Sequence, residues 1–349
     1  MTSLEPTPPL VEITDLHLDM VTLDGVAKVL NGINLTIYPG DRLGIVGETG
    51  CGKSVTAMSI AQLLPQPPAR YRQGAVRFRG EEMLGKSEEA LREARARHMG
   101  IIFQDPMTGL NPVFTIGQQM VDAILARQGE IEITDFGRNW LPHNRRRIAL
   151  AEERAVQLLR RVGIPEPEKR IHAYPHEFSG GMRQRVLIAM AIAGRPELLI
   201  ADEPTTALDV SVQAQILRLI ADLVVEINLT VLLITHNIGV VAQFCNRVAV
   251  MYAGNIVETG PVRAILQAPQ HPYTRGLLAA LPTEESVRGE LVGVPGSVPN
   301  LFDPPPGCRF APRCAHAVAR CLRATPRAIT VAPDHEVACV LYAEEGVGV

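Results

Sequence analysis

The sequence contains no apolar run that approaches the roughly 18 to 20 residues of a membrane-spanning helix, so any link to a membrane has to run through a partner. The first residues, MTSLEPTPPLVEI, lack a basic segment followed by an apolar core, and we expect no signal peptide. Basic residues are not in excess, because 34 Lys and Arg face 37 Asp and Glu. The resulting net charge of −3 argues against a general nucleic-acid-binding protein. No internal repeat is present, which predicts a single copy of the main domain.

The overall composition is that of an ordinary globular protein. Hydrophobic residues make up 46% of the 349 residues and charged residues 20%. A chain of this length buries a sizeable core, and we expect one large domain with a smaller appendage.

Strand-like and helix-like segments alternate from Val11 to about Pro261. Short β-rich runs such as INLTIY, RLGIVG, AVRFRG, ELLIAD and TVLLIT are mostly followed by helix-like stretches, which predicts an α/β domain with a largely parallel sheet. The strand signals disappear between about 105 and 178. Periodic segments around 116–126 and 149–162 predict that this stretch is an inserted helical subdomain.

Two segments fall outside this pattern. A polar, basic run around Trp140, within residues 129–147, is interpreted as a solvated loop rather than an anion site. After Pro282 the composition turns to proline, glycine and cysteine, which predicts a linker followed by a small irregular unit.

Residues 47–54 have the spacing of a P-loop, with the strand RLGIV before them and the helix KSVTAMSIAQLL after them. Glycines let the backbone curl so that its N–H groups point at phosphate oxygens, aided by the helix N-terminus. We expect Lys53 to neutralise the β- and γ-phosphates of ATP and Ser54 to bind Mg²⁺. The predicted ATP-binding residues here are Gly47, Glu48, Thr49, Gly50, Cys51, Gly52, Lys53 and Ser54.

A second acidic motif ends the buried strand LLIAD. Asp202 fits the Mg²⁺ shell, as the acid of this motif does in P-loop enzymes. Glu203 follows directly and is the candidate that orients and activates the attacking water. The alternative is a pair of surface acids with no catalytic role, and the P-loop earlier in the chain argues against it.

With these motifs the chain resembles the ATP-binding cassette (ABC) family, whose fold is a P-loop NTPase (RecA-like) core with an N-terminal antiparallel β portion and a helical subdomain. The run FSGGMRQ resembles the family signature, so Ser179, Gly180 and Gly181 are expected to contact ATP held by an opposite cassette. Further roles implied by the resemblance are a Q-loop glutamine that senses Mg²⁺ and nucleotide, a switch histidine at the γ-phosphate and a D-loop acid; these are Gln104, His236 and Asp209. The position that normally carries an aromatic residue against adenine, in the loop after the first strand, falls on Met20.

The resemblance also covers the end of the chain. His271-Pro272-Tyr273-Thr274-Arg275 and the later run VPNLFDPPPGCRFAPRC are similar to the C-terminal extension of oligopeptide and dipeptide importer ATPases. The resemblance implies a nucleotide-binding domain over residues 10–262, with the helical subdomain at about 105–178, and an extension over 263–349. It also implies an ATPase that energises peptide import, lying peripherally on the cytoplasmic face of the inner membrane. The implied partners are a second, often different, ATPase subunit, two permease subunits and an extracytoplasmic peptide-binding protein.

Four cysteines crowd the extension, separated by five, six and seventeen residues; they are Cys308, Cys314, Cys321 and Cys339. Four thiolates suit either structural zinc or an iron–sulfur cluster, and the spacing matches the usual pattern of neither. Five nearby arginines would offset the thiolate charge. The resemblance implies a [4Fe–4S] cluster, with Zn²⁺ as the alternative and four unligated cysteines as the plainer reading. We expect a structural centre whose loss leaves the P-loop chemistry intact.

Two other functions stay open. A soluble ABC ATPase of DNA repair or translation is one, although repair relatives carry long coiled coils and translation relatives carry two cassettes. The other keeps transport but changes the cargo to nickel, another small solute or an exported compound. Nickel-type relatives commonly lack the cysteine tail, and exporters usually carry a different segment before the signature.

Overall fold

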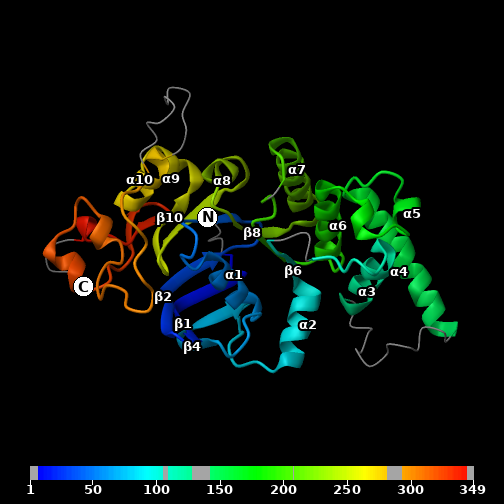
Figure 1. Cartoon of the computed structure of the whole chain (residues 1–349), viewed down its shortest axis with the longest axis horizontal. Coiled ribbons are helices and arrows are strands. Elements are labelled where there is room, and N and C mark those ends of the chain that lie inside the picture. The colour runs from blue at the N-terminus through cyan, green and yellow to red at the C-terminus, as the bar shows by residue number, and fades with distance from the viewer. Residues whose placement is uncertain (1–6, 105–108, 128–141, 207, 281–292, 344–349) are drawn as a thin grey trace, which may run out of the picture. The chain divides into compact units, whose positions relative to one another are not determined.

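The computed structural model describes residues 7–104, 109–127, 142–206, 208–280 and 293–343 (Figure 1). The chain divides into two units, and each is described by itself. The first unit consists of Met1–Gly85 and Leu232–Val349, and the second of Lys86–Val231.

The first unit contains most of the strands. Its strands are β1 (Val11–Thr22), β2 (Gly25–Ile37), β3 (Arg42–Val46), β4 (Ala69–Phe78), β5 (Glu81–Glu82), β9 (Arg247–Tyr252), β10 (Asn255–Pro261), β11 (Ile329–Ala332) and β12 (His335–Val337). Its helices are α1 (Lys53–Ala61), α8 (Ile238–Phe244), α9 (Val262–Gln267) and α10 (Pro272–Ala279), with short 3₁₀ turns η3 (Ala311–Arg313), η4 (Ala319–Leu322) and η5 (Val340–Tyr342). Strand β8 (Thr230–Ile234) lies where the chain passes from the second unit into the first.

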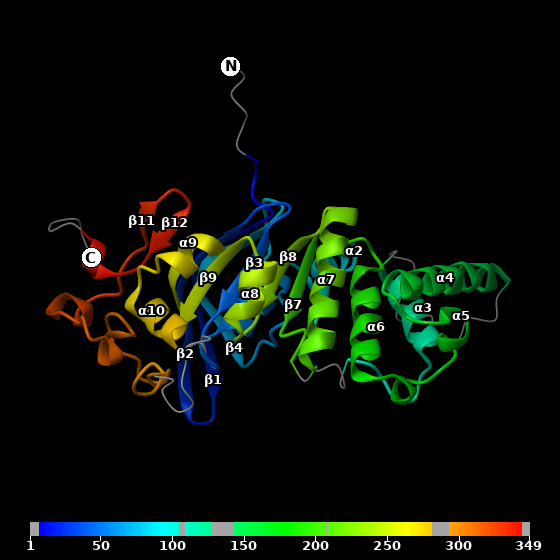
Figure 2. The ribbon, with the colours of Figure 1, turned by 90° about the horizontal axis from the view of Figure 1, so that it is seen from above.

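Strands β1, β2, β4 and β5 form an antiparallel sheet in the order β2-β1-β4-β5 (Figure 2). The two long strands form a hairpin in which Thr22 pairs with Gly25. Apolar side chains on these strands, among them Leu16, Leu18 and Leu30, are fully buried, and such one-sided burial stabilises a sheet. The antiparallel β portion expected from the resemblance is therefore present.

The other strands of the first unit lie in the order β3-β9-β10-β12-β11. Strand β9 pairs parallel with β3, which leads into the P-loop, and antiparallel with β10. Strand β12 adds to β10 through the pair Glu258 and Val337. The prediction of an irregular tail was thus wrong for this hairpin, which joins a sheet because a strand edge with free N–H and C=O groups binds another strand.

The second unit contains one pair of parallel strands and most of the helices. Its strands are β6 (Met99–Ile102) and β7 (Leu198–Asp202), and its helices are α2 (Glu88–His98), α3 (Ile116–Arg127), α4 (Pro142–Arg161), α5 (Pro167–Arg170), η2 (Pro175–Glu177), α6 (Gly180–Ile192) and α7 (Val210–Ile227). Helices α3 and α4 confirm the helical segments predicted from the periodicity. Figure 1 shows α3, α4, α5 and α6 grouped together within this unit. Trp140 and part of the basic stretch around it lie outside the described residues.

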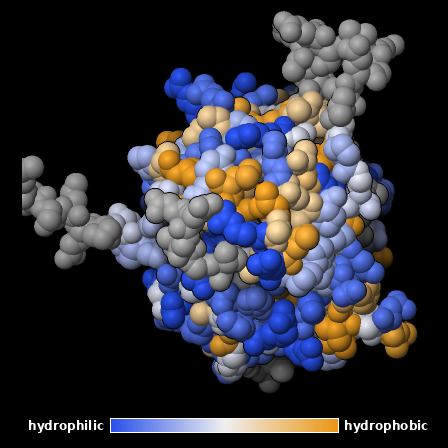
Figure 3. Space-filling view, turned by 90° about the vertical axis from the view of Figure 1, so that its left-hand side faces the viewer, coloured by the Kyte–Doolittle hydropathy of each residue, from blue (hydrophilic) through white to orange (hydrophobic). Residues whose placement is uncertain are grey.

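The extension has only a small apolar core of its own. Ala311, Cys321 and Val340 are buried together, with Cys308 packed against them. Other apolar side chains stay exposed, including Leu322 at 58%. Figure 3 shows this side of the molecule, where apolar residues lie scattered among polar ones. A unit with so little core depends on its contacts with the rest of the protein.

Candidate nucleotide site and cysteine cluster

The curled backbone of the P-loop requires glycine at two positions, Gly47 and Gly52. Gly47 has φ +155°, and a Cβ there would lie 2.1 Å from the carbonyl oxygen of Met251. Gly52 adopts a left-handed conformation, with φ 104°, directly before helix α1. These residues bring the loop against β9, while Thr49 and Gly50 at its crest stay exposed. The curled loop and the start of α1 give the arrangement that a phosphate group requires.

Lys53 lies across this loop. Its Nζ donates hydrogen bonds to the carbonyl oxygens of Gly47 at 2.8 Å and Glu48 at 3.1 Å. The side chain is buried, which holds its charge at the centre of the loop. Ser54, the predicted Mg²⁺ ligand, is half-buried next to it. Burial of the neighbouring thiol raises the pKa of Cys51, so this cysteine stays a neutral packing residue.

Two other predicted residues lie in the same unit. His236 is exposed between β8 and α8, and the N–H of the preceding Thr235 donates to the carbonyl oxygen of Ile45 at 3.2 Å. This bond holds His236 next to β3, the strand that leads into the P-loop. Met20 was expected in the loop after the first strand, but the structure places it inside β1, half-buried between its pairing partners Ala27 and Ala69.

The acidic residues of the second unit lie at the end of β7, as predicted. Asp202 is buried, with 5% of its surface exposed. The carboxylate of Glu203 accepts hydrogen bonds from the Thr206 hydroxyl at 2.8 Å and from the Gln104 amide at 3.3 Å. Glu203 has φ 47°, a conformation that costs free energy for a residue other than glycine. A carboxylate that is fixed by two hydrogen bonds, on a strained backbone at the end of a strand, can hold a water molecule in place.

The signature residues begin helix α6. The Ser179 hydroxyl caps it by accepting a hydrogen bond from the N–H of Met182 at 3.3 Å. A Cβ on Gly181 would lie 2.6 Å from the side chain of Val212 on α7, so this glycine also permits close helix packing. Gly180 has more room. The spacing of the motif alone did not predict this structural requirement.

Asp209 caps the next helix, α7. Its carboxylate accepts hydrogen bonds from the Ser211 hydroxyl at 2.6 Å and the Val212 N–H at 2.9 Å. These two bonds lower the pKa of the fully exposed Asp209. A structural role as a helix cap therefore accompanies the D-loop role implied by the resemblance.

Two of the four cysteines of the extension are in contact: Cys308 packs against the buried Cys321, whose carbonyl oxygen accepts a hydrogen bond from the Cys308 N–H at 2.7 Å. Burial raises the pKa of Cys308 to about 11 and also raises those of Cys314 and Cys339. The Cys321 sulfur accepts a hydrogen bond from the N–H of Val318 at 3.4 Å. Four cysteine sulfurs suit a thiolate centre by their type, but a raised pKa favours the neutral thiol over the thiolate that binds a metal. The geometry does not suit such a centre either, because within the described part of the chain no three or more metal-ligating side chains are grouped closely enough to hold a metal ion. The arrangement thus gives no support to the predicted [4Fe–4S] or Zn²⁺ centre.

The arginines near these cysteines have other partners. Arg309 donates to the carbonyl oxygens of Lys28 at 2.9 Å and Ala253 at 2.5 Å. Arg313 binds the carboxylate of Glu48 in the P-loop. Arg313 is thus paired with a carboxylate, whereas Arg309 binds neutral carbonyl oxygens and keeps its charge. Both fasten the extension to earlier segments of the first unit.

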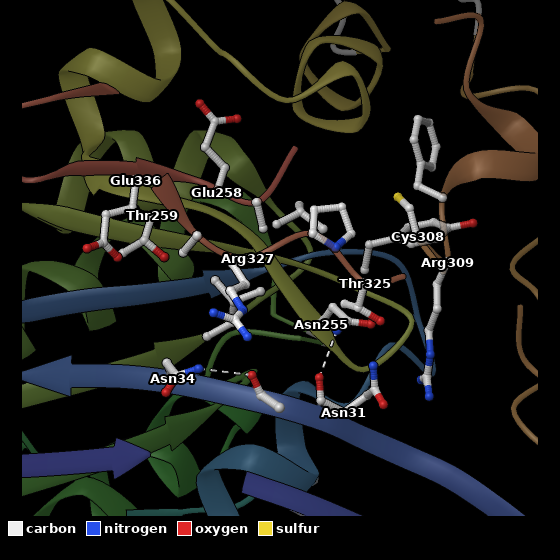
Figure 4. Close-up of a pocket in the computed structure, with 18 of the residues that line it drawn as sticks. Asn31, Asn34, Asn255, Glu258, Thr259, Cys308, Arg309, Thr325, Arg327 and Glu336 are labelled. Atoms are coloured by element: carbon white, nitrogen blue, oxygen red, sulfur yellow. Dashed lines mark hydrogen bonds between the residues drawn. The ribbon is translucent and has the colours of Figure 1, made fainter. Parts of the chain in front are cut away.

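A hollow of about 700 Å³ lies within the first unit, between the extension and strands β2 and β10 (Figure 4). Labelled side chains from β2, β10 and the extension surround it, including Asn34, Thr259, Cys308 and Arg327. No P-loop residue lines it, so this hollow is separate from the predicted phosphate site.

None of the described helices is both long enough and apolar enough to cross a membrane.

Comparison with known proteins gives the same assignment along nearly the whole chain. Residues 30–206 match the family described as "ABC transporter", and residues 257–321 match the "Oligopeptide/dipeptide transporter, C-terminal region". The oligopeptide transport ATP-binding protein OppD of Bacillus subtilis is 46% identical, over 94% of this chain and 87% of its own length. The dipeptide transport ATP-binding protein DppD of the same organism is 42% identical, over 95% and 94%. Among solved structures, a dimer of the ATP-binding cassette MJ0796, in a post-hydrolysis state with ADP and Pi, is similar with a TM-score of 0.60 and 25% identity, over 72% of this chain and 99% of its own.

Proposed function

The chain belongs to the ABC transporter family, and from this premise we propose that it is the ATP-binding and ATP-hydrolysing subunit of an importer for di- or oligopeptides. Membership of the family accounts for ATP hydrolysis coupled to transport. The observation that carries the peptide assignment is the C-terminal region over residues 257–321, which relatives named for oligopeptide and dipeptide transport share.

The structure of that region supports its use as part of the ATPase. The Tyr273 hydroxyl accepts a hydrogen bond from the N–H of Glu48 at 3.1 Å. The Tyr273 ring packs against Tyr252 and Phe310, with ring centroids 4.7 and 5.5 Å away. The region that distinguishes this branch of the family therefore supports the backbone of the P-loop.

Each motif takes one step of the proposed cycle. Lys53 and the P-loop N–H groups bind the β- and γ-phosphates, and Ser54 and Asp202 hold Mg²⁺. Glu203 orients and deprotonates the attacking water. Gln104 contacts Mg²⁺ and the nucleotide, and His236 contacts the γ-phosphate. Both residues thereby sense whether ATP is bound.

The signature and D-loop act on a second cassette. Ser179, Gly180 and Gly181 offer N–H groups and a helix N-terminus to the γ-phosphate held by that partner. Asp209 of the D-loop acts at the same interface between the two cassettes. Hydrolysis therefore requires two cassettes, which we propose are two different chains.

The remaining partners follow from the importer assignment. Two permease subunits form the pathway, a peptide-binding protein outside the membrane delivers the cargo, and this chain lies peripherally on the cytoplasmic face. The test is reconstitution of the full complex in vesicles. Uptake of a labelled dipeptide or oligopeptide, dependent on ATP and lost in Glu203→Gln, supports the proposal. Uptake of Ni²⁺ but of no peptide overturns the cargo and keeps the ATPase.

The cysteine centre remains part of the proposal. Its support is the presence of four cysteines in one small unit with little core, where Cys308 packs against Cys321. Anaerobic purification followed by iron, sulfide and zinc analysis tests it, on the wild type and on each Cys→Ser variant. Iron with sulfide supports a [4Fe–4S] cluster. Zinc without sulfide supports a zinc site instead, and the absence of both metals means that these cysteines serve only as packing residues.

A further inference from the structure

Glu48 places a negative charge inside a loop that has to bind a polyanion. The residue is the second of the P-loop, and its carbonyl oxygen accepts a hydrogen bond from Lys53, the residue predicted to bind phosphate. An unpaired carboxylate at this position would repel the phosphates of ATP and compete for Lys53. The loop therefore needs a compensating charge.

Arg313 of the extension supplies that charge. Its Nη1 lies 3.0 and 3.1 Å from the two carboxylate oxygens of Glu48. The Arg313 side chain is 5% exposed and that of Glu48 is 29% exposed, so solvent screens the pair only in part.

The guanidinium group is fixed on its other sides as well. Nε donates to the carbonyl oxygen of Pro295 and Nη2 to that of Val294, both at 2.7 Å, and Nη1 lies 3.3 Å from the Tyr252 hydroxyl. The group also lies over the Tyr252 ring, 5.6 Å from its centroid. Arg313 is therefore held rigidly by the extension and by β9 before it reaches Glu48.

Glu48 is in turn fixed through three of its groups. Its carboxylate is bound by Arg313, its N–H by Tyr273 and its carbonyl oxygen by Lys53. The first two contacts come from beyond β10, so the C-terminal segments of the chain set the position of a P-loop residue.

We propose that Arg313 is a positioning residue for nucleotide binding: it neutralises Glu48 and makes phosphate affinity depend on the folded extension. The proposal rests on the proposed ATPase function. Arg313 touches no substrate in this scheme; it acts by balancing the charge of Glu48 near the phosphates. Because Arg309 and Arg313 both lie between Cys308 and Cys314, any change that unfolds this segment also weakens the P-loop.

Two single charge variants and their combination, made in the full chain, test this, with the dissociation constant for Mg·ADP as the readout. Arg313→Met should weaken ADP binding about tenfold, the size expected for one unit charge about 10 Å away at the effective dielectric of a protein surface. Glu48→Gln alone should tighten ADP severalfold, because Arg313 then adds an uncompensated positive charge. Glu48→Gln with Arg313→Met should return the affinity to within about twofold of the wild type.

The rescue separates positioning from folding. If Arg313→Met only unfolded the extension, Glu48→Gln would not restore affinity, and that result overturns the proposal. The single Glu48→Gln variant leaves the extension untouched, so an unchanged ADP affinity there overturns it even if Arg313→Met fails to fold. Lys53→Ala serves as the control for the function itself. If the wild type binds no ADP, the ATPase proposal fails, whereas wild-type binding without the predicted charge compensation overturns only the role of Arg313.

Discussion

The side chains of Glu258 on β10 and His335 on β12 form a fully buried pair, with Oε1 and Nε2 2.8 Å apart. The same carboxylate accepts hydrogen bonds from the N–H groups of Gln270 at 2.7 Å and His271 at 2.9 Å. Glu258 therefore links β12, the last strand of the extension, and the start of α10 to strand β10.

Glu258→Gln should destabilise the protein by about 2 kcal/mol, because the amide nitrogen that replaces one carboxylate oxygen cannot accept the hydrogen bond of the N–H group it faces. Glu336→Gln is the matched control, since Glu336 lies next to this pair on β12 but is exposed. The control should change stability by less than about 0.5 kcal/mol. Urea unfolding of the two variants measures both values, and equal effects would remove the special role of Glu258.

The stability of the protein should depend on pH through His271. Burial, with a smaller effect of nearby Arg275, lowers the pKa of His271 to about 3, from 6.5 when unperturbed. Its neutral Nδ1 accepts a hydrogen bond from the N–H of Tyr273 at 3.1 Å and caps α10. Below pH 6.5 the unfolded chain binds a proton that the folded chain excludes, so stability falls as the pH drops toward 3.

Between pH 7 and pH 5 the wild type should lose about 2 kcal/mol more than His271→Asn, which keeps a helix cap but does not titrate. Unfolding curves at both pH values measure the difference. Parallel losses in the two proteins would show that other groups cause the pH dependence.

Glu203→Gln should cut ATP turnover by about 10²- to 10⁴-fold, because general-base catalysis is lost. Its ADP affinity should stay within about twofold of the wild type, since the P-loop is intact. Thr206→Val is the control: it removes one hydrogen bond to the carboxylate and should cost far less turnover. Wild-type turnover in Glu203→Gln would make the catalytic assignment wrong.

Met20→Tyr should tighten adenine nucleotides by about 0.5–1.5 kcal/mol, because a tyrosine ring adds stacking area. The cross-strand neighbours Ala27 and Ala69 have small side chains. Met20→Leu should bind ATP as the wild type does. Equal affinities of Met20→Tyr and wild type would place the base elsewhere.

Local patterns predicted most of the elements but not the contacts between distant segments. Helices α3 and α4 follow from 3.6-residue periodicity, and the P-loop from its spacing, because both are set by neighbours in the sequence. The contact of Arg313 with Glu48 joins residues 265 positions apart, and no local pattern encodes it. Distance along the chain predicted that the extension and the P-loop act independently, and this contact argues against that prediction.

The cysteines show the same difference. Their types and number predicted a cluster in the extension, but among the described residues only the packing of Cys308 against Cys321 is seen, and no three potential ligands are grouped. Ligand geometry depends on the turns between them, which spacing alone does not specify. The hairpin of β11 and β12 was missed for a related reason, since its strands are four and three residues long and give little alternation to detect.

Ser179 tests whether the signature serves a second cassette. Ser179→Asp keeps an oxygen that caps α6 but puts a negative charge where the partner's γ-phosphate is expected. The variant should fold normally and bind ADP normally, because its own P-loop is unchanged, while ATP turnover falls strongly. Ser179→Thr, which also caps and adds no charge, should keep most of the turnover. Combined with the companion ATPase subunit, Ser179→Asp should abolish turnover at the companion's P-loop, since that site uses the signature of this chain. ATP turnover of the wild type and of both variants, measured against total protein concentration in the presence of the companion subunits, reports this loss. If Ser179→Asp associates with the companion and the companion's site keeps its wild-type turnover, the signature does not act across the dimer.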